Sequence, residues 1–251
     1  MSDIIPYYKP LGMTPLQAIE KLKSERPELS PKAITYAGRL DPMAEGLLLL
    51  LTGDAIARKQ ELLDLPKTYE AKILLGFESD TFDILGLAKL IHEPGKHKNP
   101  QELITAVESL GGTHKFFYPL YSSKTVNGKP LWLLAKENKI ERANLPTREM
   151  TVLSAENITT TSEPWPKVYT QITSSISLVD GDFRQEQILQ QWAEINKNVI
   201  DPEVRILSVQ LKVTSGTYIR TIANELGKLL GTGALLLHLK RTSIGNFEIT
   251  Q

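Results

Sequence analysis

The hydrophobic residues of this chain recur with the periods of both strands and helices. Five consecutive leucines at positions 47–51, closed by Thr52-Gly53, predict a buried central strand, although leucine alone also allows a helix. Residues 67–76 and 205–213 partly alternate between apolar and polar side chains, and each predicts a further strand. Residues 217–219 could extend the second of these.

Helices are predicted where apolar residues recur every three or four positions. The first covers residues 14–26, because a threonine, a following proline and a glutamine three residues after the threonine make a capping box. Its expected inward residues are Leu16, Ile19 and Leu22. Other helices are predicted over residues 54–65, 101–110, 185–199 and 221–230, the last with Ile222, Leu226 and Leu229 inward.

Three stretches are predicted to lie outside this regular pattern. Residues 159–179 are rich in threonine and serine, and they fit either an alternating strand or a loose loop. Residues 93–100 are polar and punctuated by glycine and proline, which predicts a linker, and residues 80–86 predict a loop.

The composition is that of an ordinary soluble globular protein. The 251 residues are 41% hydrophobic and 23% charged, which fits one large domain or two small ones. The chain has no cysteine, so disulfides and thiolate catalysis are excluded, and four histidines leave few soft ligands for zinc. The first ten residues do not resemble a leader, and no stretch approaches the roughly 20 apolar residues that span a bilayer. We therefore expect a soluble cytoplasmic protein.

The charge balance argues against a nucleic-acid partner. Lysine plus arginine and aspartate plus glutamate each number 29, giving a net charge of +0, whereas nucleic-acid binders tend to carry a basic surplus. Only the distribution of the cations could support RNA binding. Cationic side chains recur at Lys67, Lys124, Lys129, Arg220, Lys240 and Arg241.

One acidic residue is held between backbone breakers in Gly38-Arg39-Leu40-Asp41-Pro42. Glycine permits positive φ, and the proline bars Asp41 from helical geometry, which predicts a tight loop leading into the leucine strand. A carboxylate so held suits a nucleophile or a general base. By spacing alone, an ordinary turn whose aspartate caps nearby amides is the favoured interpretation.

The string from Gly38 to Asp41, followed by Gly46-Leu47-Leu48, resembles the signature of pseudouridine synthases, which isomerise uridine in RNA. Four further strings are similar to one branch, the TruB family of tRNA pseudouridine synthases. They are Lys9-Pro10-Leu11-Gly12-Met13-Thr14, Lys67-Thr68-Tyr69-Glu70-Ala71, Tyr121-Ser122-Ser123 with Val126-Asn127-Gly128-Lys129, and Gly216-Thr217-Tyr218-Ile219-Arg220-Thr221 with Leu239-Lys240-Arg241. The third string also predicts an Asn-Gly hairpin turn.

The resemblance implies a role for each matching residue. Asp41 matches the catalytic aspartate, and Arg220 matches the arginine that pairs with it. Tyr69 matches the aromatic residue that stacks on the target base, and it is also a candidate for handling the proton at base carbon five. The substrate-binding candidates are Tyr36, Tyr218, Leu239, Lys9 and Lys124, of which Tyr218 and Leu239 would line the uridine pocket.

The implied fold is α+β, with a central mixed, largely antiparallel sheet flanked by helices in a single catalytic domain over residues 1–251. The implied activity is conversion of uridine to pseudouridine in the T-loop of tRNA, at position 55, by a monomer that needs no metal or cofactor. A synthase acting on ribosomal RNA, a noncatalytic tRNA-binding or tRNA-folding protein, and an enzyme acting on small molecules are the alternatives.

The sequence departs from the family pattern in several places. Tyr36 stands where bacterial relatives usually have histidine, and Tyr8 and Pro15 replace the usual aspartate and serine of the opening motif. Residues 156–202 have no recognised counterpart and are interpreted as an insert, and the chain is expected to lack the C-terminal PUA domain of many relatives. The insert could add contacts to tRNA, but its few basic residues make packing or dimerisation an equal expectation.

Overall fold

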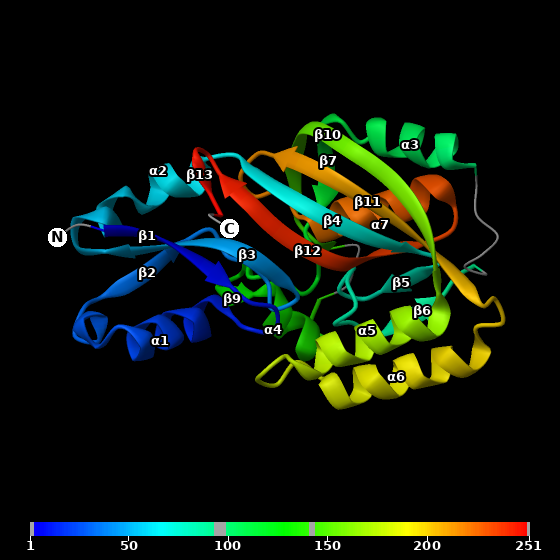
Figure 1. Cartoon of the computed structure of the whole chain (residues 1–251), viewed down its shortest axis with the longest axis horizontal. Helices are drawn as coiled ribbons and strands as arrows, with labels where there is room; N and C mark the ends of the chain where they lie inside the picture. Colours follow the sequence, from blue (N-terminus) through cyan, green and yellow to red (C-terminus); the bar gives the residue numbers. More distant parts are fainter. Residues whose placement is uncertain (1–2, 93–98, 141–143, 250–251) are drawn as a thin grey trace.

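The computed structural model describes residues 3–92, 99–140 and 144–249, which build a nine-stranded mixed sheet with helices on both faces (Figure 1). The strand order is β1-β3-β12-β4-β11-β10-β7, with β2 paired to β3 and β13 to β12. β3 and β12 run parallel, whereas the other neighbours in this sheet are antiparallel. The predicted α+β architecture with a largely antiparallel central sheet is confirmed.

The strands are β1 (Asp3–Lys9), β2 (Ile34–Ala37), β3 (Ala44–Thr52), β4 (Lys67–Leu75), β5 (Phe77–Ser79), β6 (Ala88–Leu90), β7 (Gly112–Phe117), β8 (Thr125–Val126), β9 (Lys129–Pro130), β10 (Thr147–Pro164), β11 (Glu203–Val213), β12 (Ala234–Ile244) and β13 (Phe247–Glu248). The helices are α1 (Pro15–Glu25), α2 (Lys59–Asp64), α3 (Pro100–Glu108), α4 (Leu131–Lys136), α5 (Trp165–Ser177), α6 (Gln185–Asn198) and α7 (Ile219–Leu230), with 3₁₀ turns η1 (Pro27–Leu29) and η2 (Gly53–Arg58).

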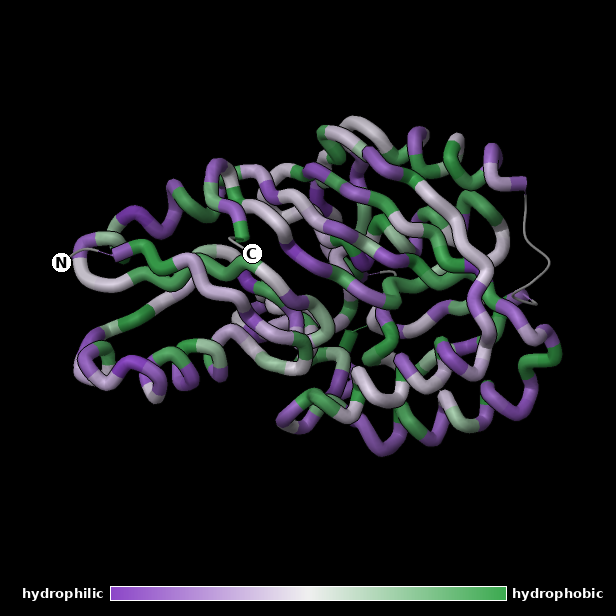
Figure 2. Tube along the Cα trace, in the orientation of Figure 1, coloured by the Kyte–Doolittle hydropathy of each residue, from purple (hydrophilic) through white to green (hydrophobic). Residues whose placement is uncertain are grey.

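Each face of the sheet buries its own hydrophobic cluster, because side chains alternate along the strands. One face packs against α3 and α7 and includes Tyr69 and Ile73 of β4. The other packs against α5 and α6 and includes Leu74 of β4 and Trp192 of α6. In Figure 1 α5 and α6 lie side by side, and in Figure 2 hydrophobic and hydrophilic residues alternate along both helices, as expected for helices with one buried face.

The register of β12 directs two motif residues to the face that carries α7. β12 pairs antiparallel with β4, and a bulge before Leu239 resets which side chains face which side. After the bulge, Leu239 lies opposite Ala71 and Arg241 lies opposite Tyr69. The same stretch of β12 runs parallel to the start of β3, so the strand that follows the Asp41 loop lies beside it.

Most predicted elements are present. The leucine run is β3, and the other two predicted strands are β4 and β11. Four of the predicted helices are α1, α3, α6 and α7, and the helix predicted over 54–65 is divided into η2 and α2. The α1 capping box forms in both directions between Thr14 and Gln17. Residues 80–86 lie in the β5–β6 connection as predicted, whereas most of the predicted linker, residues 93–98, lies outside the described residues.

The hairpin prediction is confirmed as well. β8 and β9 pair around Asn127 and Gly128, which have φ angles of 49° and 79°. Positive φ at both central residues is what a tight two-residue hairpin turn requires, and asparagine and glycine adopt it readily. The turn places Lys124 and Lys129 at the two ends of this small ribbon.

Three details of the prediction are wrong. Leu16 and Leu229 are 65% and 56% exposed, because the buried stripes of α1 and α7 pass through Ala18 and Leu230 instead. Residues 217–219 do not extend β11. The chain turns at Gly216, whose φ is +80°, and Ile219 already begins α7.

The undecided stretch 159–179 contains the end of β10 and the whole of α5. The helix buries Trp165, Val168 and Ile172 at helical spacing, but β-branched and hydroxyl residues between them hide the period. Hydroxyls such as that of Thr170, which donates to Pro166 O at 2.8 Å, bond back to the preceding turn. The segment 156–202 therefore begins inside a strand of the central sheet and continues into α5 and α6.

Close contact between β3 and β12 makes Gly46 sensitive to substitution. A Cβ added to Gly46, whose φ is +107°, would lie 2.3 Å from the carbonyl oxygen of Arg241. Gly46→Ala should therefore lower the free energy of unfolding, measured by denaturant titration, by about 2 kcal/mol or more. Gly128→Ala is the control, because Gly128 has φ +79° and open space around it. Gly128→Ala should lower the free energy of unfolding by only about 1 kcal/mol. Equal losses of stability in the two variants would contradict the steric argument.

Candidate active site

Asp41 lies in a loop whose backbone is bonded to the Lys9–Thr14 turn and to the start of β3, which directly follows it. Gly12 N–H donates to Pro42 O at 2.9 Å, and Ala44 N–H donates to Asp41 O at 3.0 Å. Gly38 has φ +84°, so the sharp reversal before Asp41 uses the freedom of glycine. The Asp41 side chain is 35% exposed, which leaves one carboxylate accessible on a rigid loop.

Arg220 is buried, and its guanidinium is held by acceptors from several parts of the chain. Nε donates to Asp41 Oδ2 at 2.8 Å, Nη1 to Thr81 O at 2.8 Å and Nη2 to Tyr121 O at 3.3 Å. Burial opposes the charge, but the carboxylates of Asp41 and Asp83 raise the pKa of Arg220 above its ordinary value. The arginine predicted to pair with Asp41 does so in the structure.

Asp83 is a second acid beside Arg220, and the sequence reasoning placed its segment only in a loop. Its Oδ2 lies 3.7 Å from Arg220 Nε, and its Oδ1 accepts from Thr81 Oγ1 at 2.6 Å and from Leu85 N–H at 3.0 Å. Burial raises the pKa of Asp83 to about 6, although Arg220 and the Thr81 hydroxyl both favour its ionised form. The sequence did hold a signal for Asp83, because it is an acidic residue in a mostly polar stretch soon after the strand that carries Tyr69.

Arg241 is the second buried arginine of the site and was given no role from the sequence. Its Nε donates to Leu47 O at 2.7 Å, and its two Nη atoms donate to Arg39 O at 3.3 Å and Gly38 O at 3.1 Å. Nη1 also lies 3.5 Å from the hydroxyl of Tyr69. Arg241 therefore holds the loop backbone on both sides of Asp41 and links that loop to Tyr69.

Lys9 is fully buried, and the structure shows it bonded to its own loop. Nζ donates to Met13 O at 2.7 Å and to Pro10 O at 3.0 Å. Burial lowers the pKa of Lys9 to about 7, and the nearby Asp41 charge opposes that shift. These contacts make Lys9 a support for the Lys9–Thr14 turn, which in turn holds the Asp41 loop through Gly12.

Tyr218 and Leu239 both lie beside α7, the helix that carries Arg220. Tyr218 is the residue before α7, and burial followed by the Asp41 charge raises its pKa. Its ring packs edge-on against Tyr118, with centroids 5.7 Å apart, and Lys124 Nζ lies 5.5 Å from the Tyr118 ring. Leu239 is nearly buried in the cluster that includes Tyr69.

Tyr36 lies on β2 between two cationic side chains. Lys59 Nζ is 5.5 Å from the centre of its ring, and Arg39 Nη2 donates to its hydroxyl at 3.3 Å. Tyr36 is partly exposed, and no contact of it with Asp41 or Arg220 was found among the described residues. The site therefore has a buried centre around Arg220, to which the partly exposed Asp41 is bonded, and a cationic surface around Tyr36.

Only part of the cationic motif set is available to a ligand. Arg220 and Arg241 are buried, and Lys67 donates to Leu65 O at 2.6 Å with its pKa lowered to about 8 by burial. Lys124 and Lys129 remain exposed. Among the described residues, no three His, Asp or Glu side chains are grouped to hold a metal.

Comparison with known proteins agrees with the motifs. Residues 26–178 match the family model described as TruB family pseudouridylate synthase (N terminal domain), which is more than half of the chain. The chain belongs to the TruB family. The family predicted from the motifs is therefore confirmed, and the match ends within the segment 156–202.

Curated TruB-family relatives are longer than this chain. A protein of Aromatoleum aromaticum named tRNA pseudouridine synthase B is 32% identical over 97% of this chain, which covers 63% of its length. Proteins with the same name from Thermosipho melanesiensis and Alkaliphilus oremlandii are 28% and 30% identical, with 66% and 67% of their length covered. The chain thus spans about two thirds of the relatives that it matches.

Solved structures support the fold. A chain of the structure titled "Crystal Structure of a Cbf5-Nop10-Gar1 Complex" aligns with a TM-score of 0.60 at 19% identity, covering 98% of this chain and half of that one. A chain of a structure of an H/ACA RNP bound to a substrate RNA containing 2'-deoxyuridine aligns with a TM-score of 0.56 at 18% identity, over 98% and 49% of the two chains. None of the helices in the described part of this TruB-family chain is long and apolar enough to cross a membrane.

The raised pKa of Asp83 predicts how stability depends on pH. Between the ordinary value near 4 and about 6 the folded chain binds more protons at this site than the unfolded chain, so stability falls as pH rises. Asp83→Asn removes this dependence. Its free energy of unfolding, relative to the wild type, should increase from pH 4 to pH 7 by up to about 3 kcal/mol.

The control for this measurement is Asp54→Asn, which changes an exposed aspartate in η2. Unfolding curves at a series of pH values should show this control running parallel to the wild type. If Asp83→Asn also ran parallel to the wild type, the pKa of Asp83 would be the same in the folded and unfolded chain, and the argument from burial would be wrong.

Proposed function

We propose that this chain isomerises uridine to pseudouridine in the T-loop of tRNA, at position 55. The observation that carries the proposal is the bond between Arg220 Nε and Asp41 Oδ2, 2.8 Å long, in which the arginine is buried and the carboxylate is 35% exposed. The printed name of the relatives, tRNA pseudouridine synthase B, favours tRNA over ribosomal RNA as the substrate.

The buried centre suits a base that has left its stack. Flipping a uridine out of folded RNA costs a few kcal/mol, and stacking on an aromatic ring returns roughly 1–3 kcal/mol. Tyr69 and Leu239 belong to the cluster that packs against α7, and Tyr218 directly precedes this helix, so we assign all three to the walls around the flipped base. The hydroxyl of Tyr69, held 3.5 Å from Arg241, is the assigned group for the proton at base carbon five.

The reaction rearranges bonds within the substrate. The bond between ribose carbon one and base nitrogen one breaks, a bond from the same ribose carbon to base carbon five forms, and the proton lost from carbon five is balanced by one gained at nitrogen one. Asp41 either adds to the base at carbon six or assists departure of the base from the ribose. In both routes Arg220 fixes the attacking carboxylate from one side and leaves its exposed part free.

The surface around the centre provides the grip on RNA. Arg39 and Lys59 flank the ring of Tyr36, and Lys124 lies beside Tyr118 near Tyr218. We assign these residues to phosphate and base contacts, because arginine and lysine beside an aromatic ring suit both. All of these groups belong to one chain, so the proposed site needs no second subunit, and we infer a monomer with a single catalytic domain over residues 1–251.

The test is incubation of the purified protein with unmodified tRNA and with ribosomal RNA, followed by mapping of pseudouridine. Pseudouridine at position 55 of tRNA supports the proposal. Pseudouridine in ribosomal RNA alone would assign the chain to the alternative substrate. Tight binding of tRNA without any conversion would favour a noncatalytic tRNA-binding protein.

Asp41→Asn should abolish conversion while leaving the fold and RNA affinity nearly unchanged. The amide keeps the size of the side chain but cannot act as the nucleophile, so single-turnover conversion should fall by roughly a thousandfold or more. Circular dichroism and filter binding to a T-arm RNA check the fold and the affinity. Substantial turnover in this variant would remove Asp41 from the chemistry.

Tyr69→Phe and Tyr69→Ala should separate stacking from proton handling. The phenylalanine variant keeps the ring and should bind RNA normally while converting it slowly, whereas the alanine variant should lose affinity and turnover together. Tyr169→Phe, on α5 in the opposite cluster, is the matched control and should do neither. If Tyr69→Ala behaved as the wild type, Tyr69 would serve packing only.

A further inference from the structure

The segment 156–202 contains three cationic side chains, and in the structure each is bonded to a carboxylate. Lys167 bonds to Glu163 at 2.6 Å, and Lys197 bonds to Glu194 at 2.8 Å. Both pairs join residues three or four positions apart and are exposed, and such surface pairs contribute little to the stability of the fold. Arg184 is different, because it contacts residues outside the segment.

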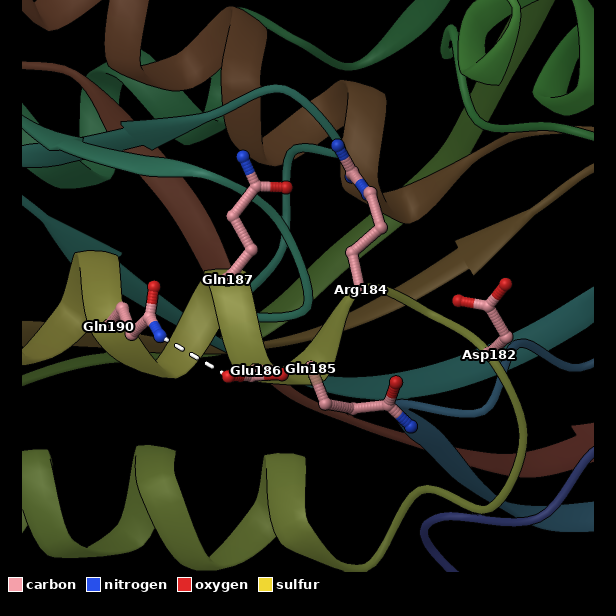
Figure 3. A pocket seen from close by; sticks show the side chains of 6 residues that line it. All are labelled: Asp182, Arg184, Gln185, Glu186, Gln187 and Gln190. Atoms are coloured by element: carbon pink, nitrogen blue, oxygen red, sulfur yellow. Dashed lines mark hydrogen bonds between the residues drawn. The ribbon is translucent and has the colours of Figure 1, made fainter.

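Arg184 lies between α5 and α6 and is only 19% exposed. It bonds to Asp80 through two atoms, Nη1 to Oδ2 at 2.8 Å and Nη2 to Oδ1 at 3.4 Å. Its guanidinium carbon also lies 4.2 Å from the centre of the Tyr121 ring. Figure 3 shows Arg184 and Gln185 leaving the start of α6 in opposite directions, Arg184 toward the rest of the domain and Gln185 back toward the α5–α6 turn.

The two residues that Arg184 contacts belong to the segments that hold Arg220. Asp80 directly precedes Thr81, whose carbonyl accepts from Arg220 Nη1, and the carbonyl of Tyr121 accepts from Arg220 Nη2. We propose that Arg184 is a positioning residue, which fixes both carbonyl acceptors of Arg220 and so sets the orientation of Arg220 toward Asp41. The proposal rests on the function proposed above, and it assigns the α5–α6 segment to support of the catalytic centre.

The turn that carries Arg184 is held by hydrogen bonds within the turn and by contacts to α1 and α4. Gln185 Nε2 donates to Val179 O at 2.9 Å and to Gly181 O at 2.6 Å, which closes the turn. Asp180 accepts from Gln17 Nε2 at 3.0 Å, and Asp182 bonds to Lys136. The turn is therefore fixed to α1 and α4 as well as to the Asp80 loop.

A fourth contact connects the turn to the Asp41 loop. A Cβ on Gly12 would lie 2.4 Å from the carbonyl oxygen of Leu178, at the end of α5. Gly12 is also the residue whose N–H donates to Pro42 O. A substitution of Arg184 that loosened the turn would therefore displace Arg220 through the carbonyls of Thr81 and Tyr121. It would also displace the Asp41 loop through Gly12.

The backbone of Arg184 has an unusual conformation, as expected for a residue that must be placed accurately. Its φ is +65°, in the left-handed region that residues other than glycine and asparagine seldom adopt. Arginine is suited to the contact itself, because its planar fork binds a carboxylate through two atoms while its flat face covers an aromatic ring. Lysine can supply the charge but neither of these features.

The first measurement is single-turnover conversion of a T-arm RNA by Arg184→Met, with Lys197→Met as the matched control. Both variants remove one cation from the same segment, but Lys197 lies on the exposed side of α6. At saturating RNA the Arg184 variant should convert uridine roughly ten- to a hundredfold more slowly, because small displacements of catalytic groups cost that much. Its affinity for RNA should stay within twofold of the wild type, and the control should match the wild type in both.

The second measurement reports on Arg220 without activity. The Nε–H of Arg220, bonded to Asp41, should give a slowly exchanging arginine signal in ¹⁵N NMR, assigned by its loss in Arg220→Met. In Arg184→Met this signal should shift and exchange faster, and in Lys197→Met it should not. If Arg184→Met fails to fold by circular dichroism, Arg184→Lys and Asp80→Asn replace it, with the same expected losses of rate and protection.

The outcomes separate this inference from the proposed function. Weaker RNA binding with a normal single-turnover rate would overturn it and make Arg184 an RNA contact. An unchanged rate together with an unchanged Arg220 signal would also overturn it. If the wild type converted no RNA, the proposed function would fail, and the Arg220 signal would still decide whether Arg184 positions that arginine.

Discussion

The structure around the candidate site depends on one buried positive charge, the guanidinium of Arg220, which is 5% exposed. Removing such a group from water costs several kcal/mol, and only close acceptors offset that cost. The acceptors come from segments far apart in the chain: Asp41 before β3, Thr81 after β5, and Tyr121 before β8. The carboxylate of Asp83 adds a negative charge 3.7 Å away. These segments converge on one side chain, so the charge to which we assign a role in the chemistry also fixes the loops around it.

Two buried arginines hold different parts of the Asp41 loop. Arg241 bonds to the carbonyl oxygens of Gly38, Arg39 and Leu47, so it holds the backbone of the loop, whereas Arg220 holds the carboxylate of Asp41. The bulge in β12 makes this possible, because without the reset of alternation Arg241 would face the opposite cluster. The backbone and the side chain of the loop are therefore fixed by independent interactions.

Elements that depend on residues close together in the sequence could be predicted from the sequence. The capping box of α1, the leucine strand and the Asn-Gly turn all follow from residues within a few positions of one another. The pairing of Asp41 with Arg220 came from the family motifs, since no local pattern joins residues so far apart. Asp83 and Arg184 belong to no motif. The role of Asp83 is visible only where the fold brings the β5–β6 loop to Arg220, and that of Arg184 only where the fold brings the α5–α6 turn to Asp80.

The net charge of +0 is compatible with an RNA substrate once the cations are located. Arg220 and Arg241 are buried and Lys67 bonds to backbone carbonyls, so these three cations hold the fold and are not exposed for phosphate contacts. The number of basic residues in the motifs is therefore a poor measure of phosphate contacts. Under the proposed function, contacts to phosphates would therefore fall to exposed groups such as Arg39 and Lys124, and the buried cations would act on RNA only through the loops that they hold.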